Sequence, residues 1–154
     1  MKGTRHTQPR RAARGFTLVE LMIVIMIVAL LAAVGYPSYG AFITKSRRQA
    51  ARNVIYQIAD RQEQFFLDNK VYATDLSSMG FAANTIGVDE DGQITDSGDV
   101  DRSYVVDLSA ATATTYTVRA APQLVQATND TDCMTLTLTH TGVRAQSGAS
   151  DNCW

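Results

Sequence analysis

The amino-acid sequence predicts an α+β protein in which a long N-terminal helix packs on a small antiparallel β-sheet. Three observations support this fold class. An apolar run covers residues 16–34, helical periodicity continues to about residue 69, and segments of strand character begin only after residue 100. The helix would be hydrophobic all round in its first half and amphipathic in its second. The sheet is then expected to cover the apolar face of that second half.

The chain begins with a basic leader that holds five of its 14 basic residues and none of its 15 acidic ones. A basic start before an apolar core is typical of a secretory signal. Residues 31–35 form a poor cleavage site after that core. A cut between Gly15 and Phe16 would instead remove residues 1–15 and keep the apolar segment, shifting the formal net charge from −1 to −6. The alternative is an uncleaved signal anchor.

Residues 16–38 are the predicted membrane-spanning and assembly half of the helix. Helix from 16 to 34 would extend about 28 Å, close to the hydrocarbon thickness of a bilayer. The basic leader would stay cytoplasmic, which places the C-terminal part of the chain outside. Pro37 predicts a helix kink rather than a helix end, because helical periodicity resumes directly after it.

Glu20 is a lone carboxylate near the start of this apolar segment. A charge within a bilayer costs roughly 2.5–3.5 kcal/mol on insertion scales, so such residues are usually functional and have a specific partner. Cleavage after Gly15 would create a new cation on Phe16, four residues away. An anion in the first turn also suits the helix dipole. A contact within one chain, or a carboxylate that reaches the membrane surface, is the alternative.

Residues 39–69 form the predicted amphipathic half of the helix, with one face that needs a cover. The residues of that face recur at helical spacing: Ala51, Val54, Ile55, Ile58, Gln62, Phe65 and Phe66. Arg47, Arg48 and Arg52 form a basic patch outside it. This patch is interpreted either as a solvated face or as a source of ion pairs between subunits.

Residues 70–154 form the predicted globular head. Residues 70–101 are rich in turn-forming residues and are expected to be a loop. Strands are predicted at 103–108, 115–120 and 133–139, with a short fourth strand near Val143 and Arg144. In the third strand, Met134, Leu136 and Leu138 would share one buried face.

Cys133 and Cys153 are the only cysteines. In an oxidising compartment two cysteines usually form a disulfide. The loop of about 20 residues between them would be worth roughly 3 kcal/mol in the chain-entropy model. Free thiols or a metal pair are alternatives, although no neighbouring histidine or further cysteine completes a zinc site. Trp154 lies beside Cys153 and is expected either to pack there or to contact a partner.

Neither an enzyme nor a metal or cofactor site is predicted. His140 is the only histidine outside the leader, so the sequence offers no catalytic triad and no histidine metal cluster. Acidic residues gather at 89–101, but the EF-hand pattern fails because Gly87 and Gly98 occupy its first and last ligand positions. A solvated loop is the preferred interpretation, and a calcium loop of another kind stays open.

Residues Gly15 to Val24 read Gly-Phe-Thr-Leu-Val-Glu-Leu-Met-Ile-Val, which resembles the class III signal of type IV prepilins. The resemblance implies that a membrane prepilin peptidase cuts after Gly15 and methylates Phe16. It implies that Glu20 neutralises the N-terminal amine of a neighbouring subunit. It also implies the pilin fold, with a Cys133–Cys153 disulfide that bounds a C-terminal surface loop.

The expected function is therefore that of a structural subunit of a type IV pilus, supporting pilus biogenesis, twitching motility or adhesion. Residues 36–39 and the Cys153-Trp154 end look like those of small minor pilins. The implied partners are other pilin subunits in a helical filament, the inner-membrane assembly machinery and membrane lipid. The precursor would lie in the inner membrane with its head in the periplasm, and the mature subunit in the extracellular pilus. Ala29 replaces a glycine common in the family, so loosening of the helix on assembly is less expected here.

Two rival roles share the N-terminal motif. A type II secretion pseudopilin commonly lacks a C-terminal disulfide, which counts against it. A DNA-receptor pilin of natural transformation would need a basic stripe on the head. Arg102, Arg119 and Arg144 are too few and too scattered in the sequence to form one, and the mature chain is acidic. A nucleic-acid partner is therefore not expected.

Overall fold

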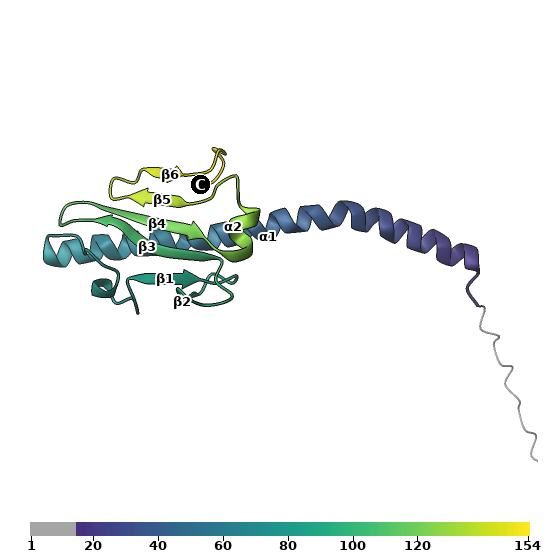
Figure 1. Cartoon of the computed structure of the whole chain (residues 1–154), viewed down its shortest axis with the longest axis horizontal. Coiled ribbons are helices and arrows are strands. Elements are labelled where there is room, and N and C mark those ends of the chain that lie inside the picture. Colours follow the sequence, from purple (N-terminus) through teal and green to yellow (C-terminus); the bar gives the residue numbers. More distant parts are fainter. Residues whose placement is uncertain (1–14) are drawn as a thin grey trace, which may run out of the picture. The chain divides into compact units, whose positions relative to one another are not determined.

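The computed structural model describes residues 15–154, so the basic leader at 1–14 lies outside the described residues. The chain divides into two compact units, one ending at Tyr39 and one covering Gly40–Trp154. Helix α1 (Leu18–Asn69) contributes residues to both. The remaining elements, all in the second unit, are η1 (Ser77–Met79), β1 (Thr85–Val88), β2 (Ile94–Asp96), β3 (Tyr104–Ala111), β4 (Tyr116–Pro122), α2 (Leu124–Asn129), β5 (Leu136–Thr139) and β6 (Arg144–Gln146) (Figure 1).

The first unit is the start of α1, and it exposes its apolar side chains. Every large apolar side chain from Phe16 to Leu31 is at least 50% exposed. Pro37 lies within α1 and does not end it, and the kink predicted there stays a prediction. Residues 16–38 were expected to span a membrane; among the described residues, no helix is both long and apolar enough to do so.

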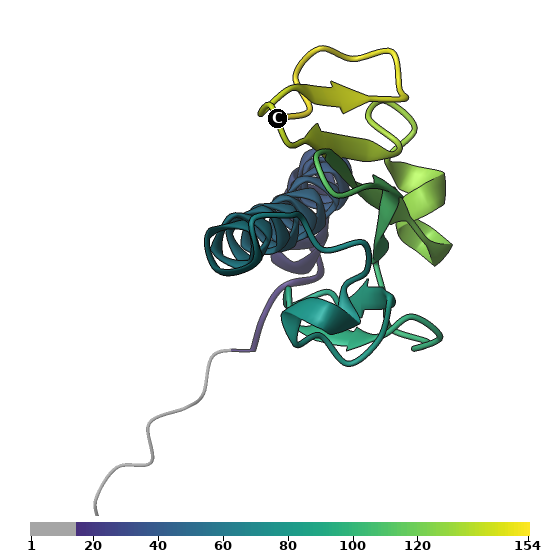
Figure 2. The same cartoon turned by 90° about the vertical axis from the view of Figure 1, so that its left-hand side faces the viewer.

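The second unit is an α+β head, which confirms the predicted fold class. Its six strands are ordered β2-β1-β3-β4-β5-β6, and every neighbouring pair is antiparallel. The sheet curves around one side of the C-terminal part of α1 (Figure 2). Its buried face contributes these side chains to the core: Ile86, Val88, Tyr104, Val106, Val118, Ala120, Leu136 and Leu138.

The predicted apolar face of α1 is the face that the sheet covers. Ala51, Val54, Ile55 and Ile58 are at most 3% exposed. Gln62 is also fully buried, and its amide makes two hydrogen bonds to Ala73: Nε2 donates to the carbonyl oxygen and Oε1 accepts from the backbone N–H, both at 2.9 Å. The Gln62 side chain thereby satisfies the backbone N–H and C=O of Ala73 in the segment after α1, where no helix or strand provides partners for them.

The prediction that residues 70–101 form only a loop is wrong. The segment contains η1, β1 and β2, and β1 pairs with β3 as an inner strand of the sheet. Strands of three and four residues carry little periodicity, and Gly87 interrupts the apolar pattern of β1. Gly87 is required because a Cβ there would lie 2.4 Å from the carbonyl oxygen of Asp96 on β2. Pairing with β3, rather than local preference, makes this segment a strand.

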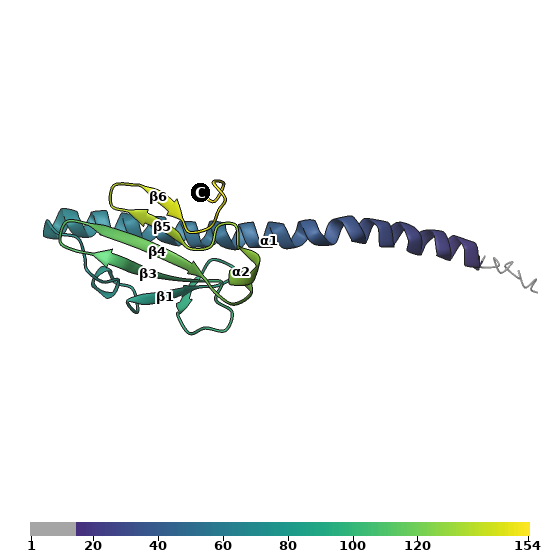
Figure 3. The same cartoon turned by 45° about the horizontal axis from the view of Figure 1, so that its top comes forward.

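The predicted strand at 133–139 begins too early, because β5 starts at Leu136. Met134 has a φ of +51°, is 44% exposed and does not share the buried face of Leu136 and Leu138. Its N–H donates to the carbonyl oxygen of Asp130, which closes a turn before the strand. Helix α2, which the sequence analysis did not predict, precedes this turn and follows β4 directly (Figure 3).

We expect Gln62→Ala to lower the free energy of unfolding by roughly 2–4 kcal/mol, because both backbone polar groups of Ala73 would lose their buried partner. Gln64→Ala, two residues away at an exposed position of α1, should change the free energy of unfolding by less than about 0.5 kcal/mol. Denaturant unfolding of the full-length chain in detergent, followed by the fluorescence of the single tryptophan, measures both. Equal effects of the two substitutions would contradict this role of Gln62.

Candidate functional site

The N-terminal end of α1 carries the residues predicted to be processed and to direct assembly. Gly15, Phe16 and Thr17 precede the helix, and Phe16 is 79% exposed. Thr17 is the N-cap residue: its Oγ1 accepts a hydrogen bond from the Glu20 N–H at 3.2 Å. In return the Thr17 N–H donates to Glu20 Oε2 at 3.4 Å. This reciprocal arrangement is a capping box.

The capping box was visible in the sequence as Thr17-Leu18-Val19-Glu20 but was not part of the prediction. It means that, within one chain, the Glu20 carboxylate contacts its own helix end. This is the alternative that the sequence analysis left open. The carboxylate is exposed and lies near the positive end of the helix dipole, where a nearby amine could also reach it.

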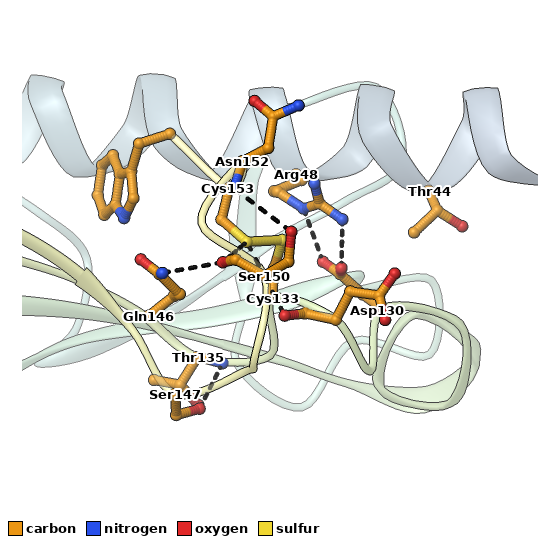
Figure 4. Close-up of a disulfide and its surroundings, with 12 residues drawn as sticks. Thr44, Arg48, Asp130, Cys133, Thr135, Gln146, Ser147, Ser150, Asn152 and Cys153 are labelled. Atoms are coloured by element: carbon orange, nitrogen blue, oxygen red, sulfur yellow. Dashed lines mark hydrogen bonds and ion pairs between the residues drawn. A yellow bond between two sulfur atoms is a disulfide. The ribbon is translucent and has the colours of Figure 1, made fainter.

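The C-terminal end of the chain is fixed by a disulfide between Cys133 and Cys153, which confirms the predicted pair (Figure 4). The Cα atoms are 5.5 Å apart, and both residues are about 1% exposed. The segment between them contains the β5–β6 hairpin. The N–H groups of Gly148 and Ser150 donate to the carbonyl oxygens of Cys133 and Asp132, so the returning chain is also held by its backbone.

A buried ion pair joins α1 to the turn before this disulfide. Arg48 Nε donates to Asp130 Oδ2 at 3.1 Å, and Nη2 contacts Oδ1, so the pair is bidentate (Figure 4). The Asp130 side chain is fully buried and that of Arg48 is 12% exposed. The Tyr104 hydroxyl, from β3, donates to Asp130 Oδ2 at 2.5 Å. Gln126 Nε2 donates to the Tyr104 hydroxyl at 3.1 Å and to Asp130 Oδ2 at 3.2 Å. We call Arg48, Asp130, Tyr104 and Gln126 the buried polar cluster.

The environment of the buried polar cluster shifts two ionisation equilibria in the direction that stabilises it. The hydrogen bond to Asp130 raises the pKa of Arg48, against the effect of its burial. Burial, reinforced by the Asp130 carboxylate, raises the pKa of the Tyr104 hydroxyl far above its usual value of 10. Both shifts favour the charged form of Arg48 and the protonated, hydrogen-bond-donating form of Tyr104.

The basic patch on α1 is used within the chain. Arg47 pairs with Glu90, Arg48 pairs with Asp130, and Arg52 Nη1 donates to the carbonyl oxygen of Cys153 at 3.4 Å. Neither sequence-based interpretation of this patch described such contacts. Sequence reasoning missed them because their partners lie 43 to 101 residues further along the chain.

A second group of cations remains without an acidic partner among the described residues, and we call it the cationic surface. It consists of Lys45 and Arg52 from α1 and Arg144 from β6, together with Tyr56 and Trp154. The Arg144 guanidinium lies 5.6 Å above the ring centroid of Tyr56, and the rings of Tyr56 and Trp154 meet edge to face at 6.2 Å. A pocket of about 240 Å³ lies here, lined by Lys45, Arg48, Gln49, Arg52, Asn152, Cys153 and Trp154.

The other two head arginines lie elsewhere. Arg119, on β4, pairs with Asp107 on β3, and Arg102 donates to the backbone of Asp99. The scattering predicted for Arg102, Arg119 and Arg144 therefore holds in the fold. The sequence analysis overlooked the contribution of α1. It places Lys45 and Arg52 at one pocket with Trp154, whose ring meets the Tyr56 ring that Arg144 covers.

Two of the acidic residues at 89–101, Asp89 and Asp99, bind their own loop. Asp89 Oδ1 accepts from the N–H groups of Asp91 and Gln93, and Asp99 accepts from the Thr95 hydroxyl and the Asp101 N–H. These hydrogen bonds lower the pKa of Asp99, the Asp101 N–H contributing most. Within residues 15–154, no group of three potential metal ligands is brought together.

Two protein-family models match the chain. Residues 10–36 match the prokaryotic N-terminal methylation motif. Residues 37–137, about two thirds of the chain, match the family described as type IV minor pilin ComP, DNA uptake sequence receptor. The chain belongs to this family of type IV pilins. The family that residues 15–24 indicated is therefore confirmed.

Two curated relatives of this pilin agree with the family match. It is 33% identical over 78 residues to the fimbrial protein EcpC of Eikenella corrodens, an alignment that covers 51% of each chain. It is 36% identical over 69 residues to the type IV major pilin protein PilA of Myxococcus xanthus, covering 45% of this pilin and 31% of PilA. A solved type IV pilin from Shewanella oneidensis aligns with a TM-score of 0.46 at 22% identity, covering 72% of this chain and 97% of that one. The pilin thus spans about half or less of the length of these two curated relatives.

We expect Asp130→Asn to lower the free energy of unfolding by about 3 kcal/mol, because it leaves the largely buried Arg48 guanidinium without its counter-charge. Asp132→Asn, two residues away at an exposed position, is the matched control and should be close to neutral. Thermal unfolding of the full-length pilin in detergent compares the two. A change of less than about 1 kcal/mol for Asp130→Asn would show that the pair contributes little.

Proposed function

We propose that this pilin is a minor structural subunit of a type IV pilus. It would be made as a single-pass inner-membrane precursor with its head in the periplasm. A prepilin peptidase would cut it after Gly15 and methylate Phe16, and the assembly machinery would move it into an extracellular filament. The observation that carries this proposal is the methylation motif at residues 10–36, which covers the whole processing site and its apolar segment.

The structure supports this role through what the first unit leaves exposed. Its apolar side chains are half exposed or more from Phe16 to Leu31, and a surface of this kind needs lipid or neighbouring helices to cover it. Glu20 is the one charge within it. In a bundle of such helices the carboxylate would need a cation, and the new amine of Phe16 on a neighbouring subunit is the cation that processing creates.

The minor rather than major role rests on the family description, which names minor pilins, and on the likeness of the C-terminal Cys153-Trp154 end to those of small minor pilins. A pseudopilin of type II secretion is the alternative for the same processed chain. The location of the mature chain distinguishes a minor pilin from a pseudopilin. A minor pilin is recovered at a low ratio in sheared filaments, whereas a pseudopilin stays in the membrane.

We expect Glu20→Ala to be cleaved normally but to enter filaments poorly, because the neighbouring amine would lose its counter-charge in an apolar environment. The intact mass of the wild-type chain in sheared filaments should begin at methylated Phe16. The variant should show the same mass in the membrane fraction and a several-fold lower amount in the filament fraction. Asp68→Ala, which removes an exposed carboxylate near the C-terminal end of α1, is the control. Normal incorporation of Glu20→Ala would overturn the proposed pairing.

A second candidate function is reception of DNA, and two observations favour it over the sequence-based expectation. The family description names a DNA uptake sequence receptor. The cationic surface joins Lys45, Arg52 and Arg144 to two aromatic rings, a combination suited to phosphates and to stacked bases. The net charge of −6 after processing restricts attraction to this local surface rather than to the whole head.

We expect binding of this pilin to double-stranded DNA, measured by fluorescence anisotropy, to weaken with salt. Lys45→Ala should reduce the log–log salt slope by about 1, as expected for one lost phosphate contact. Lys70→Ala removes the same charge directly after the C-terminal end of α1, away from the cationic surface, and should leave the salt slope unchanged. An unchanged slope for Lys45→Ala would place DNA elsewhere, and absence of salt-dependent binding would remove this candidate.

A further inference from the structure

The peptide bond that processing would cut lies just before α1. Under the proposed function, a peptidase hydrolyses the bond between the Gly15 carbonyl carbon and the Phe16 nitrogen. Water supplies the hydroxyl to that carbon and the proton to that nitrogen, which leaves a carboxyl group on Gly15 and an amine on Phe16. Only Phe16 and Thr17 separate this bond from the first helical residue, Leu18. The position of the helix start therefore decides whether the bond is presented inside or outside a helix.

The Thr17 side chain opposes an earlier helix start. The first backbone hydrogen bond of α1 runs from the Leu21 N–H to the Thr17 carbonyl oxygen at 3.2 Å. One residue more of helix would direct the Glu20 N–H to the Phe16 carbonyl oxygen. That N–H donates instead to Thr17 Oγ1, also at 3.2 Å. Among residues 15–154, no backbone N–H donates to the carbonyl oxygen of Gly15 or Phe16.

Without this hydroxyl, Gly15 is the next suitable residue to begin the helix. Glycine is accepted at the N-cap position, whereas the Phe16 side chain offers no oxygen for a cap. An N-cap residue gives its carbonyl oxygen to the first helical hydrogen bond, and for Gly15 the donor would be the Val19 N–H. A Cβ placed on Gly15 would meet no atom of the described residues within 4 Å, so packing does not keep it out of the helix.

An earlier helix start would hinder hydrolysis for two reasons. The Gly15 carbonyl group, which water must attack, would be hydrogen-bonded within the helix. A peptidase also holds its substrate through backbone N–H and C=O groups, and a helix uses these groups internally. In the observed arrangement the bond lies outside the helix, and the Phe16 side chain after it is 79% exposed.

We propose that the Thr17 hydroxyl positions the Gly15–Phe16 bond for cleavage by keeping the start of α1 at Leu18. Thr17 is a positioning residue, because it acts through the helix start and not on the reacting atoms. The inference rests on the proposed function, since it concerns the same processing site.

The two halves of the capping box would then serve different steps. Thr17 Oγ1 accepts from the backbone N–H of residue 20, which does not depend on the side chain there. Glu20→Ala therefore keeps the hydrogen bond that sets the helix start, in agreement with the normal cleavage expected for it. What this substitution removes is the carboxylate that accepts from the Thr17 N–H and hydroxyl and that assembly would use.

The test compares how fast the prepilin peptidase cuts full-length precursors in detergent. Thr17→Val keeps the shape of the side chain without its capping oxygen, whereas Thr17→Ser and Thr17→Asn supply other strong caps. We expect kcat/KM to fall about fivefold in Thr17→Val, as the loss of one typical cap implies, and to stay near the wild-type value in the other two. Thr114→Val, the same change at an exposed position between β3 and β4, is the control.

NMR of the same precursors without peptidase measures the helix start directly. The Cα chemical shifts of Gly15 and Phe16 should move towards helical values in Thr17→Val and stay unchanged in Thr17→Asn. Shifts that do not move in Thr17→Val would overturn the proposal even if cleavage slows. Recovery of cleavage by Thr17→Ser but not by Thr17→Asn would also overturn it, because the peptidase would then recognise the hydroxyl itself.

The cleavage assay separates this inference from the proposed function. A wild-type precursor that the peptidase does not cut after Gly15 would refute the proposed processing and this inference with it. If the wild-type precursor is cut and Thr17→Val is cut equally fast, the inference alone is refuted.

Discussion

The head of this pilin depends on one buried contact, the bidentate pair between Arg48 of α1 and Asp130. Asp130 follows α2 and precedes the disulfide, and it also accepts from Tyr104 of β3. One carboxylate therefore holds the helix, the sheet and the C-terminal turn in a common register. A buried pair of this kind adds little net stability compared with an apolar contact of the same size, but an unpaired member is costly. Its value here is geometric, because alternative packings of α1 on the sheet would leave one charge buried alone.

This arrangement also decides where the remaining charges act. Arg47, Arg48 and Arg119 are paired with carboxylates of the head. These three arginines are therefore not part of the cationic surface. Three cations without an acidic partner among the described residues, Lys45, Arg52 and Arg144, lie instead where α1, β6 and the C-terminal tryptophan meet. The disulfide holds this region, since Arg52 binds the carbonyl oxygen of Cys153 and the Trp154 indole donates to Ala145. Reduction of the disulfide would therefore loosen the cationic surface.

The sequence predicted those parts of the molecule that are set by local pattern. The amphipathic face from Ala51 to Gln62, the strands β3 and β4 and the pairing of two lone cysteines follow from periodicity and composition. Strands β1 and β2 were missed because they depend on pairing with β3, and β5 was begun too early because the Asp130–Met134 turn is set by tertiary contacts. The ion pairs of α1 were missed for a similar reason. Nothing local to Arg48 distinguishes it from a solvated arginine.

The capping box at the start of α1 bears on how assembly could begin. In the single chain the Glu20 carboxylate accepts hydrogen bonds from the N–H and the hydroxyl of Thr17, both at 3.4 Å and therefore longer than usual. These contacts orient the carboxylate without neutralising it. In water a competing amine would gain little, because charge–charge attraction is weak at high dielectric; among packed apolar helices the same attraction is far stronger. Under the proposed function, the carboxylate would therefore exchange its own helix end for a neighbouring amine only inside such a bundle. Only a subunit cut after Gly15 would carry that amine on Phe16.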